Sequence, residues 1–501
     1  MAIAQNYLTI QYTEPNKGNL INHAYHDFVL SMEGKNLYQQ FYQNITGFKY
    51  VLQVWHDEDG KLIEMKVPPN AKSQGLFNTR SIFEDITKTD EGGYDGKRKN
   101  DSGISSTQAQ LSFTDRPHAI HQIDRYARNR QNLRRVYFGL TCEFFSNGVF
   151  YETIVKFPKI DNKTNFLPFY LLWNACLQHP KEQRGLDRFI DYMLSNQARK
   201  FLTNKRTDCV RSVRNTDYET LAFFNGTFRV SQGGHGGVSY NPNFTSVVDN
   251  IYIKAYGSGA FEMEIPNISS NCGSYNPIFQ SQYVSLQYPA STDEGLLYVG
   301  VGCQNIANNG LNDTAGNPVT IATFNGITHY EIWARNNSNA QISEKIRFDV
   351  ISANCKYESI RIAYLNRLGA YDYFNFIKKS VNRTEITRSN YKANYGYLPL
   401  QYNDVNENNH WDYGSYEGGT RSYNVNAIET IEANSDFMNE SDATALQELF
   451  TSPVCYIQRN GEFEPCVVTE KDYVLQTTDN DKLKQYIVSI QLGNEQRIQR
   501  L

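Results

Sequence analysis

Short runs of β-branched and aromatic residues, bounded by turn-forming residues, constrain the fold of this chain most. The clearest pair lies at 48–55 and 61–67, and the Asp- and Gly-rich segment between them completes the pattern of a β-hairpin. Similar runs recur at 136–141, 148–155, 250–256, 295–301 and 328–334. Several short strands separated by turns predict immunoglobulin-like β-sandwich modules. We therefore expect a mostly β, multidomain fold.

Length and composition agree with this expectation. The chain has 501 residues, enough for roughly two to four domains. Aromatic residues make up 13%, with 35 Tyr and 28 Phe, and these side chains favour the half-buried surface of a sheet. The 49 basic and 53 acidic residues nearly balance. The resulting net charge of −4 excludes a strongly basic nucleic-acid-binding chain.

One stretch departs from the strand pattern. Apolar residues between 186 and 202 recur at helical spacing, and basic residues follow them, which predicts a helix over about 185–204. We expect this helix to form a small insertion. The predicted organisation comprises an N-terminal β domain at 1–165, a helical insertion at 166–215, a central β-sandwich at 216–380, an extended arm at 381–440 and a C-terminal helix-plus-hairpin domain at 441–501.

The arm is predicted from composition and from the lack of a pattern. Residues 381–435 are rich in Tyr and Asn, poor in aliphatic residues and low in periodicity. A segment of this length without its own core is typical of an extended arm that becomes ordered against another surface. We therefore expect the arm to contact a partner.

The C-terminal domain begins with a predicted short helix. Ser441 and Asp442 can cap a helix that runs through 445–450. Pro453 cannot continue a helix, so the helix is expected to end before it.

A β-hairpin is predicted to follow this helix. The Asn-Gly turn at 460–461 sets a register that puts Cys455 opposite Cys466 and Pro465 opposite Tyr456. Pro465 then occupies a non-hydrogen-bonded position, where its missing N–H costs nothing. A disulfide between the two cysteines is one interpretation, and two reduced thiols are the favoured one for a cytosolic product.

The sequence also predicts where the chain is made. Its N-terminus lacks the basic and apolar regions of a secretory signal, and the longest apolar stretch, 166–173, is too short to span a membrane. The eight Cys include no CxxC pair, which excludes the common zinc-ribbon spacing. We expect a chain that folds in a cytosol and has no membrane anchor.

Motifs for catalysis or cofactor binding are missing from the sequence. No GxSxG, HExxH or complete GxGxxG motif occurs. The nearest features are better explained as loops or surface histidines: a phosphate-loop-like segment at 92–97 that is one residue short, the pairs His23/His26 and His118/His121 without a third ligand, and His235 in a Gly-rich run. We predict no catalytic residue, no metal ligand and no cofactor. The 53 acidic residues do not single out the carboxylate pair of a glycosidase.

One cluster of basic residues is dense enough to form a patch. It comprises Arg125, Arg128, Arg130, Arg134 and Arg135. Such a cluster could face DNA in a lumen or an acidic partner surface. A solvated or salt-bridged face is the interpretation that the near-neutral chain favours.

The segment 355–376, CKYESIRIAYLNRLGAYDYFNF, resembles one that recurs in virion proteins of phages infecting Bacteroides and its relatives, particularly the crAss-like phages. The runs at 48–55 and 67–70 are similar to the N-terminal part of those proteins, and 446–453 through 480–486 to their ending. The three blocks are collinear and span most of the chain. The most specific block contains Asn366, Gly369 and the aromatic–Asp–aromatic cluster Tyr371, Asp372, Tyr373 and Phe374.

This resemblance implies a structural virion protein without catalytic residues, a ring component of the tail barrel or neck of a short-tailed phage. Such rings are homo-oligomers, usually six- or twelve-fold, and conduct the genome during ejection. The implied partners are copies of the chain, neighbouring tail rings, portal or adaptor proteins, and transiently the exiting DNA. The implied location is the virion tail, assembled in the host cytoplasm. The six motif residues are expected at an interface or in a structural role.

Alternatives remain open because the stretch at 166–210 lies outside the shared blocks. A tail appendage, a fibre-attachment protein or a receptor-binding protein would fit the same composition, since Tyr and Asn suit stacking and hydrogen bonding with sugars. A tail-borne glycan depolymerase is the enzyme alternative.

Overall fold

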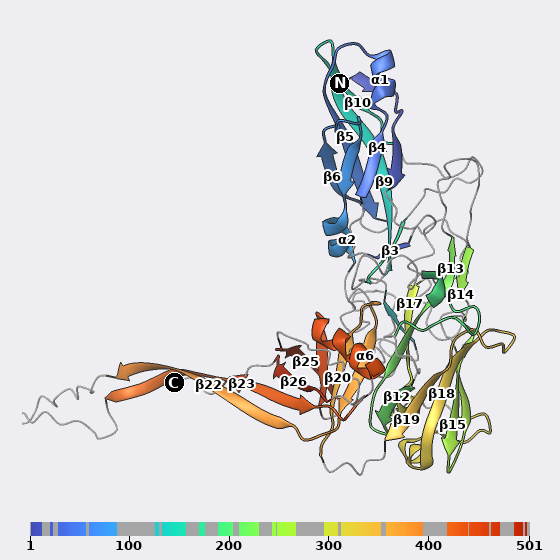
Figure 1. Cartoon of the computed structure of the whole chain (residues 1–501), viewed down its shortest axis with the longest axis vertical. Helices are drawn as coiled ribbons and strands as arrows, with labels where there is room; N and C mark the ends of the chain where they lie inside the picture. The colour runs from blue at the N-terminus through green and yellow to red at the C-terminus, as the bar shows by residue number, and fades with distance from the viewer. Residues whose placement is uncertain are drawn as a thin grey trace, which may run out of the picture. The chain divides into compact units, whose positions relative to one another are not determined.

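Figure 1 shows the computed structural model of the chain. The structure describes residues 2–12, 21–23, 29–56, 60–87, 126–129, 133–156, 170–175, 189–203, 210–229, 243–246, 248–266, 295–308, 312–351, 357–393, 418–438, 440–459, 462–470, 485–493 and 496–497. The chain is mostly β and contains several multi-stranded sheets, which confirms the predicted fold class.

A seven-stranded sheet organises the N-terminal region. Its strands are β1 (Ala2–Ala4), β3 (Ile21–His23), β5 (Ile45–His56), β6 (Gly60–Val67), β9 (Leu133–Ser146), β10 (Val149–Thr153) and β11 (Tyr170–Trp173). The predicted hairpin is confirmed, because β5 and β6 pair antiparallel with Tyr50 opposite Val67. A second turn joins β9 to β10 through Asn147 and Gly148, which both have positive φ, as a two-residue hairpin turn requires.

A three-stranded sheet and two short helices complete this region. The sheet holds β2 (Thr9–Tyr12), β4 (Val29–Glu33) and β7 (Gly75–Asn78), and the helices are α1 (Lys35–Phe41) and α2 (Arg80–Ile86). The core is aromatic: the buried ring of Tyr38 lies 5.8 Å from Phe48 and 5.4 Å from Phe144. Burial of each such ring stabilises the fold by about 1.5–3 kcal/mol.

Two further sheets share one hydrophobic core in the central part of the chain. The five-stranded sheet has the order β12 (Val210–Arg214), β19 (Ile346–Ile351), β18 (Ile327–Arg335), β15 (Asn250–Gly257) and β16 (Glu262–Pro266). The four-stranded sheet has the order β14 (Asn243–Ser246), β13 (Thr220–Arg229), β17 (Gly295–Gly300) and β8 (Tyr126–Asn129). Phe223 and Val299 from the second sheet belong to the same buried cluster as Ile253, Ile332 and Phe348 from the first. Two sheets around one core is the arrangement of a β-sandwich.

Two short helical elements contribute further residues to the same hydrophobic cluster. These are α5 (Cys303–Asn308) and the 3₁₀ helix η5 (Ile321–Gly326), and they contribute the buried residues Cys303, Ile306 and Phe324.

The C-terminal region is built on one eight-stranded sheet. It runs β21 (Tyr371–Phe376), β20 (Ile360–Leu365), β24 (Cys455–Arg459), β25 (Glu462–Val468), β26 (Ile487–Leu492), β23 (Gly419–Asn434) and β22 (Val381–Ala393), and β27 (Gln496–Arg497) pairs with β23. The hairpin register predicted from the Asn-Gly turn is confirmed: Cys455 lies opposite Cys466, and Tyr456 lies opposite Pro465. The predicted short helix is also present as α6 (Glu440–Thr451), which begins before Ser441 and Asp442 rather than after them.

The chain divides into two compact units. The larger comprises 1–354 and 364–373, and the smaller comprises 355–363 and 374–501. The expected boundaries at 165, 215 and 380 differ from this division. The reason is strand pairing: β20 joins β24 in one sheet, so residues that precede 380 belong with the C-terminal region.

The prediction of a helix over 185–204 is wrong for the part of this stretch that the structure describes. Residues 189–203 contain the short 3₁₀ helix η4 (Phe189–Tyr192) followed by turns. Asn196 initiates one of these turns, since its side-chain oxygen accepts a hydrogen bond from the N–H of Ala198. Leu194 and Phe201 are buried although they lie outside any helix. Their apolar character therefore reflects burial in the tertiary structure and not one face of a helix.

The predicted arm at 381–435 contains regular structure. β22 and β23 pair antiparallel from Val381 opposite Glu432 to Ala393 opposite Gly419. Residues 394–417, which connect the two strands, lie outside the described residues. The arm is therefore a two-stranded ribbon over the residues that the structure describes.

Candidate functional site: a buried charge network at a hairpin tip

The segment singled out by resemblance forms the tip of the hairpin β20–β21, residues 364–373, which belongs to the larger unit. Asn366 shapes this tip. Its side-chain oxygen accepts hydrogen bonds from the N–H groups of Leu368 (2.9 Å) and Ala370 (3.1 Å), and its own N–H donates to the carbonyl of Ala370 (2.7 Å). Asn is suited to this position because its short side chain can bond to its own backbone a few residues on.

Gly369 is required by two independent features of the same turn. Its φ is +77°, a conformation that residues with a Cβ adopt at a cost. A Cβ at this position would also lie 2.0 Å from the carbonyl oxygen of Asn174. The turn therefore fits closely against the segment that follows β11.

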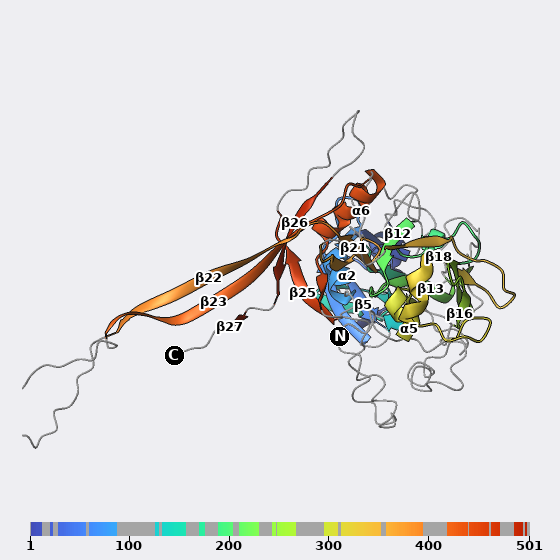
Figure 2. The same ribbon diagram turned by 90° about the horizontal axis from the view of Figure 1, so that it is seen from below.

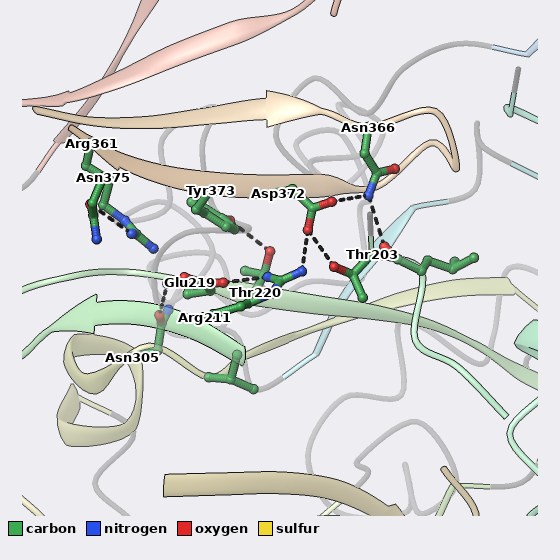
Figure 3. Close-up of polar contacts among 12 residues, drawn as sticks. Thr203, Arg211, Glu219, Thr220, Asn305, Arg361, Asn366, Asp372, Tyr373 and Asn375 are labelled. Atoms are coloured by element: carbon green, nitrogen blue, oxygen red, sulfur yellow. Dashed lines mark hydrogen bonds and ion pairs between the residues drawn. The ribbon is translucent and has the colours of Figure 1, made fainter. Parts of the chain in front are cut away.

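Asp372 connects the tip to other segments of the larger unit (Figure 3). One carboxylate oxygen accepts a hydrogen bond from the Nδ2 of Asn366 at 2.7 Å. The other accepts from the Thr203 hydroxyl at 2.8 Å and from the Arg211 guanidinium at 2.5 Å. Asn366 also donates to the carbonyl of Leu202 at 3.2 Å.

Arg211 lies between two carboxylates. Its Nη1 donates to Glu219 at 2.5 Å and its Nη2 to Asp372 at the same distance. The side chains of Arg211, Glu219 and Asp372 are between 2% and 5% exposed, so the network is removed from water. Burial lowers the pKa of Arg211, but the charges of Asp372 and Glu219 raise it by more, and the net direction is upward. The guanidinium thus stays protonated.

Aromatic residues of the motif complete the packing of the tip. Tyr371 and Tyr373 are buried, and the Tyr373 hydroxyl lies 2.8 Å from that of Thr220. The indole N–H of Trp173 donates to the carbonyl of Leu368 at 2.9 Å. Phe374 lies in β21 outside the tip, and its ring is 4.8 Å from that of Phe376.

This network has the properties of a buried polar network that stabilises the fold, and not those of a reactive centre. Its charged groups are buried and bonded to one another, and its cation is an arginine, which stays protonated near neutral pH and so cannot act as a base. The motif residues Asn366, Tyr371, Asp372 and Tyr373 are buried within the chain's own contacts.

The predicted arginine patch is divided between two sheets. The backbone of Arg128 lies on β8 opposite Leu297 of β17, in the four-stranded sheet. Arg134 and Arg135 lie on β9 opposite Leu172 and Leu171 of β11, in the seven-stranded sheet. Arg125 and Arg130 lie outside the described residues.

The other singled-out residues form no reactive site in the described part of the chain. Cys455 and Cys466 are free, buried thiols; burial raises the pKa of Cys455 to about 11 and raises that of Cys466 further. His23 lies on β3, while His26, His118, His121, His235 and the segment 92–97 lie outside the described residues.

Within the residues described, no group of three or more His, Cys, Asp or Glu is placed to hold a metal ion. In that same part of the chain, no helix combines the length and apolar character needed to cross a membrane.

Sequence reasoning did not single out Thr203, Arg211 or Glu219. A signal was present for Arg211, because β12 alternates and its residue Arg211 is buried on the same face as Val213. A charged residue on the buried face of a strand requires a partner, but nothing local names that partner.

Comparison with protein-family models found no match to this chain. Comparison with curated proteins likewise found no relative.

Proposed function

We propose that this chain is a structural subunit of a short-tailed phage particle, and that copies of it assemble into a ring of the tail barrel or neck through which the genome leaves. The ring would contact neighbouring tail rings, portal or adaptor proteins. The proposal starts from the resemblance of 355–376 to virion proteins of crAss-like phages.

The observation that carries the proposal is the ribbon of β22 and β23. Every residue from Val381 to Arg388 is exposed, and exposed Ile386, Tyr391 and Tyr423 add apolar surface. An isolated two-stranded ribbon is marginally stable in water, because it buries too little apolar area. A chain that forms such a ribbon is suited to a permanent assembly in which another subunit covers it.

The buried tip network supports the same proposal. A ring subunit that surrounds exiting DNA needs rigid elements, and a buried, fully connected set of polar bonds rigidifies the part of the fold that contains it. Asn366, Asp372 and Arg211 form such a set within the larger unit.

Negative-stain imaging of the purified full-length chain, together with mass measurement in solution, tests the proposal. We expect closed rings with a central opening and a mass that is an integral multiple, six- or twelve-fold, of 57.6 kDa. A chain that stays monomeric at every concentration, and that occupies no ring position in labelled virions, would contradict it. Cleavage of polysaccharide by the purified chain would favour the depolymerase instead.

A further inference from the structure

The ribbon of β22 and β23 is supported by other strands over only part of its length. β26 pairs with β23 from Thr430 to Asn434, and β27 pairs with it at Asn426 and Ala427. Among the described strands, β22 has β23 as its single neighbour along all of its length. Figure 2 shows the two strands continuing together beyond the rest of their sheet. The outer edge of β22 therefore presents unpaired backbone groups of a kind that readily accept a further strand.

Charge is distributed unevenly along this ribbon. The proximal half, defined as 381–385 of β22 with 428–432 of β23, carries a net charge of −2 from Arg383, Glu385, Glu429 and Glu432; Glu432 pairs with Arg383, and Glu429 pairs with Arg459 of β24. The distal half, defined as 386–393 with 419–427, carries +3 from Arg388, Lys392 and Arg421 and contains no acidic residue. The two halves are therefore complementary in charge.

The chain's own geometry does not bring these charges together. The nearest such pair along β22, Glu385 and Arg388, is separated by three residue steps, which corresponds to roughly 10 Å in an extended strand. This separation exceeds the screening length of about 8 Å at physiological ionic strength. Neither Arg388 nor Lys392 forms an ion pair with any residue in the described part of the chain. Within the described residues, Arg388 and Lys392 are therefore available to another molecule.

We propose that the distal half of the ribbon in one copy of this chain packs edge to edge on the proximal half of the ribbon in a second copy. This contact brings Arg388 and Lys392 of the positive distal half against the negative proximal half, covers the exposed side chains of Ile386 and Tyr391, and gives β22 a second strand neighbour. The proposal rests on the proposed function, since a ring is what brings the copies together.

A second copy fits the ribbon better than a nucleic acid does. The whole hairpin, 381–434, contains four basic residues, Arg383, Arg388, Lys392 and Arg421. It contains seven acidic residues, Glu385, Asp404, Glu407, Asp412, Glu417, Glu429 and Glu432. Over the sequence 381–434 acidic residues outnumber basic ones by three, which disfavours phosphate, whereas charges of both signs in separate halves of the ribbon suit self-association.

A charge-exchange experiment with the full-length chain tests the contact. One variant carries Arg388→Glu and Lys392→Glu, so that both halves are negative. The other carries Glu385→Lys and Glu432→Lys, so that both halves are positive. We expect each variant alone to need at least tenfold more protein than the natural chain for half-maximal assembly, measured by mass photometry and sedimentation. An equimolar mixture should recover assembly, because each negative ribbon then meets a positive one.

The matched control carries Lys72→Glu and Arg347→Glu, two reversals at exposed positions outside the ribbon, and should assemble like the natural chain. Failure of the mixture to recover assembly, or normal rings from either variant alone, would overturn the ribbon contact and leave the proposed ring intact. A natural chain that never assembles would instead remove the ring itself. Protection of the ribbon only after another virion protein is added would assign it to that protein and overturn the contact between copies.

Discussion

Individual residues at the hairpin tip illustrate how much one side chain can decide. Gly369 combines a positive φ with a close approach to the carbonyl of Asn174, and Arg211 combines complete burial with two carboxylate partners. Each therefore allows a substitution whose cost has identifiable physical causes.

Gly369→Ala is expected to be strongly destabilising. Gly316 provides a matched control, because its φ is +89° but nothing lies within 4 Å of a Cβ built there. Gly316→Ala should cost about 1–2 kcal/mol from the backbone conformation alone. Gly369→Ala should cost a further 1–3 kcal/mol or so, because the Cβ must displace the Asn174 carbonyl. Urea unfolding of both variants measures the difference, and equal costs would show that the turn does not pack as described.

Arg211→Met tests the charge network. Removal of the guanidinium leaves Glu219 and Asp372 buried without their cation, so we expect a loss of about 3–5 kcal/mol in the free energy of unfolding. The control is Arg347→Met, because Arg347 is 47% exposed and its pair with Asp349 is in water. That change should cost about 0–1 kcal/mol. Similar losses for the two variants in urea unfolding would refute the idea that the network holds the tip.

At the scale of elements, strand pairing can be predicted from local sequence where strongly turn-forming residues connect the strands. It cannot be predicted where they do not. The hairpins β5–β6 and β24–β25 were predictable because turn residues stand between two β-prone runs. The ribbon strand β22 was not, since a strand exposed on both faces has no alternation of apolar and polar residues. The apolar spacing at 186–202 led to a wrong prediction of a helix. Apolar residues there, such as Leu194 and Phe201, are buried by tertiary packing and do not form one face of a helix.

Limited proteolysis tests the ribbon as an element. In the monomer, trypsin should cut after Arg388, Lys392 and Arg421, because a marginally stable ribbon opens often. In the assembled state these sites should be protected, while Arg211 in the buried strand β12 resists in both states and serves as the control. Mass spectrometry of the fragments identifies the sites of cleavage. Equal cleavage of the ribbon in the monomer and in the assembly would show that no subunit covers it.

At the scale of the whole molecule, the division into units does not follow chain order. Residues 355–363 and 374–501 form one unit, while the intervening 364–373 belongs to the other. Composition divides a chain only into consecutive segments. No local pattern reveals that the hairpin β20–β21 is divided between two units. The near-zero net charge of −4 suits the proposed assembly of copies of this chain.

The sequence by itself determined the mostly β class, the hairpin at 48–67 and the register of the hairpin that pairs Cys455 with Cys466, because turn chemistry and strand propensity act over a few residues. Tertiary structure alone decided that Thr203, Arg211 and Glu219 meet Asp372, that 189–203 is irregular, and that 381–393 forms a ribbon with 419–434. The separation between Arg211 and Asp372 is 161 residues along the chain. Contacts over such a separation depend on which surfaces bury together, and no local propensity encodes that.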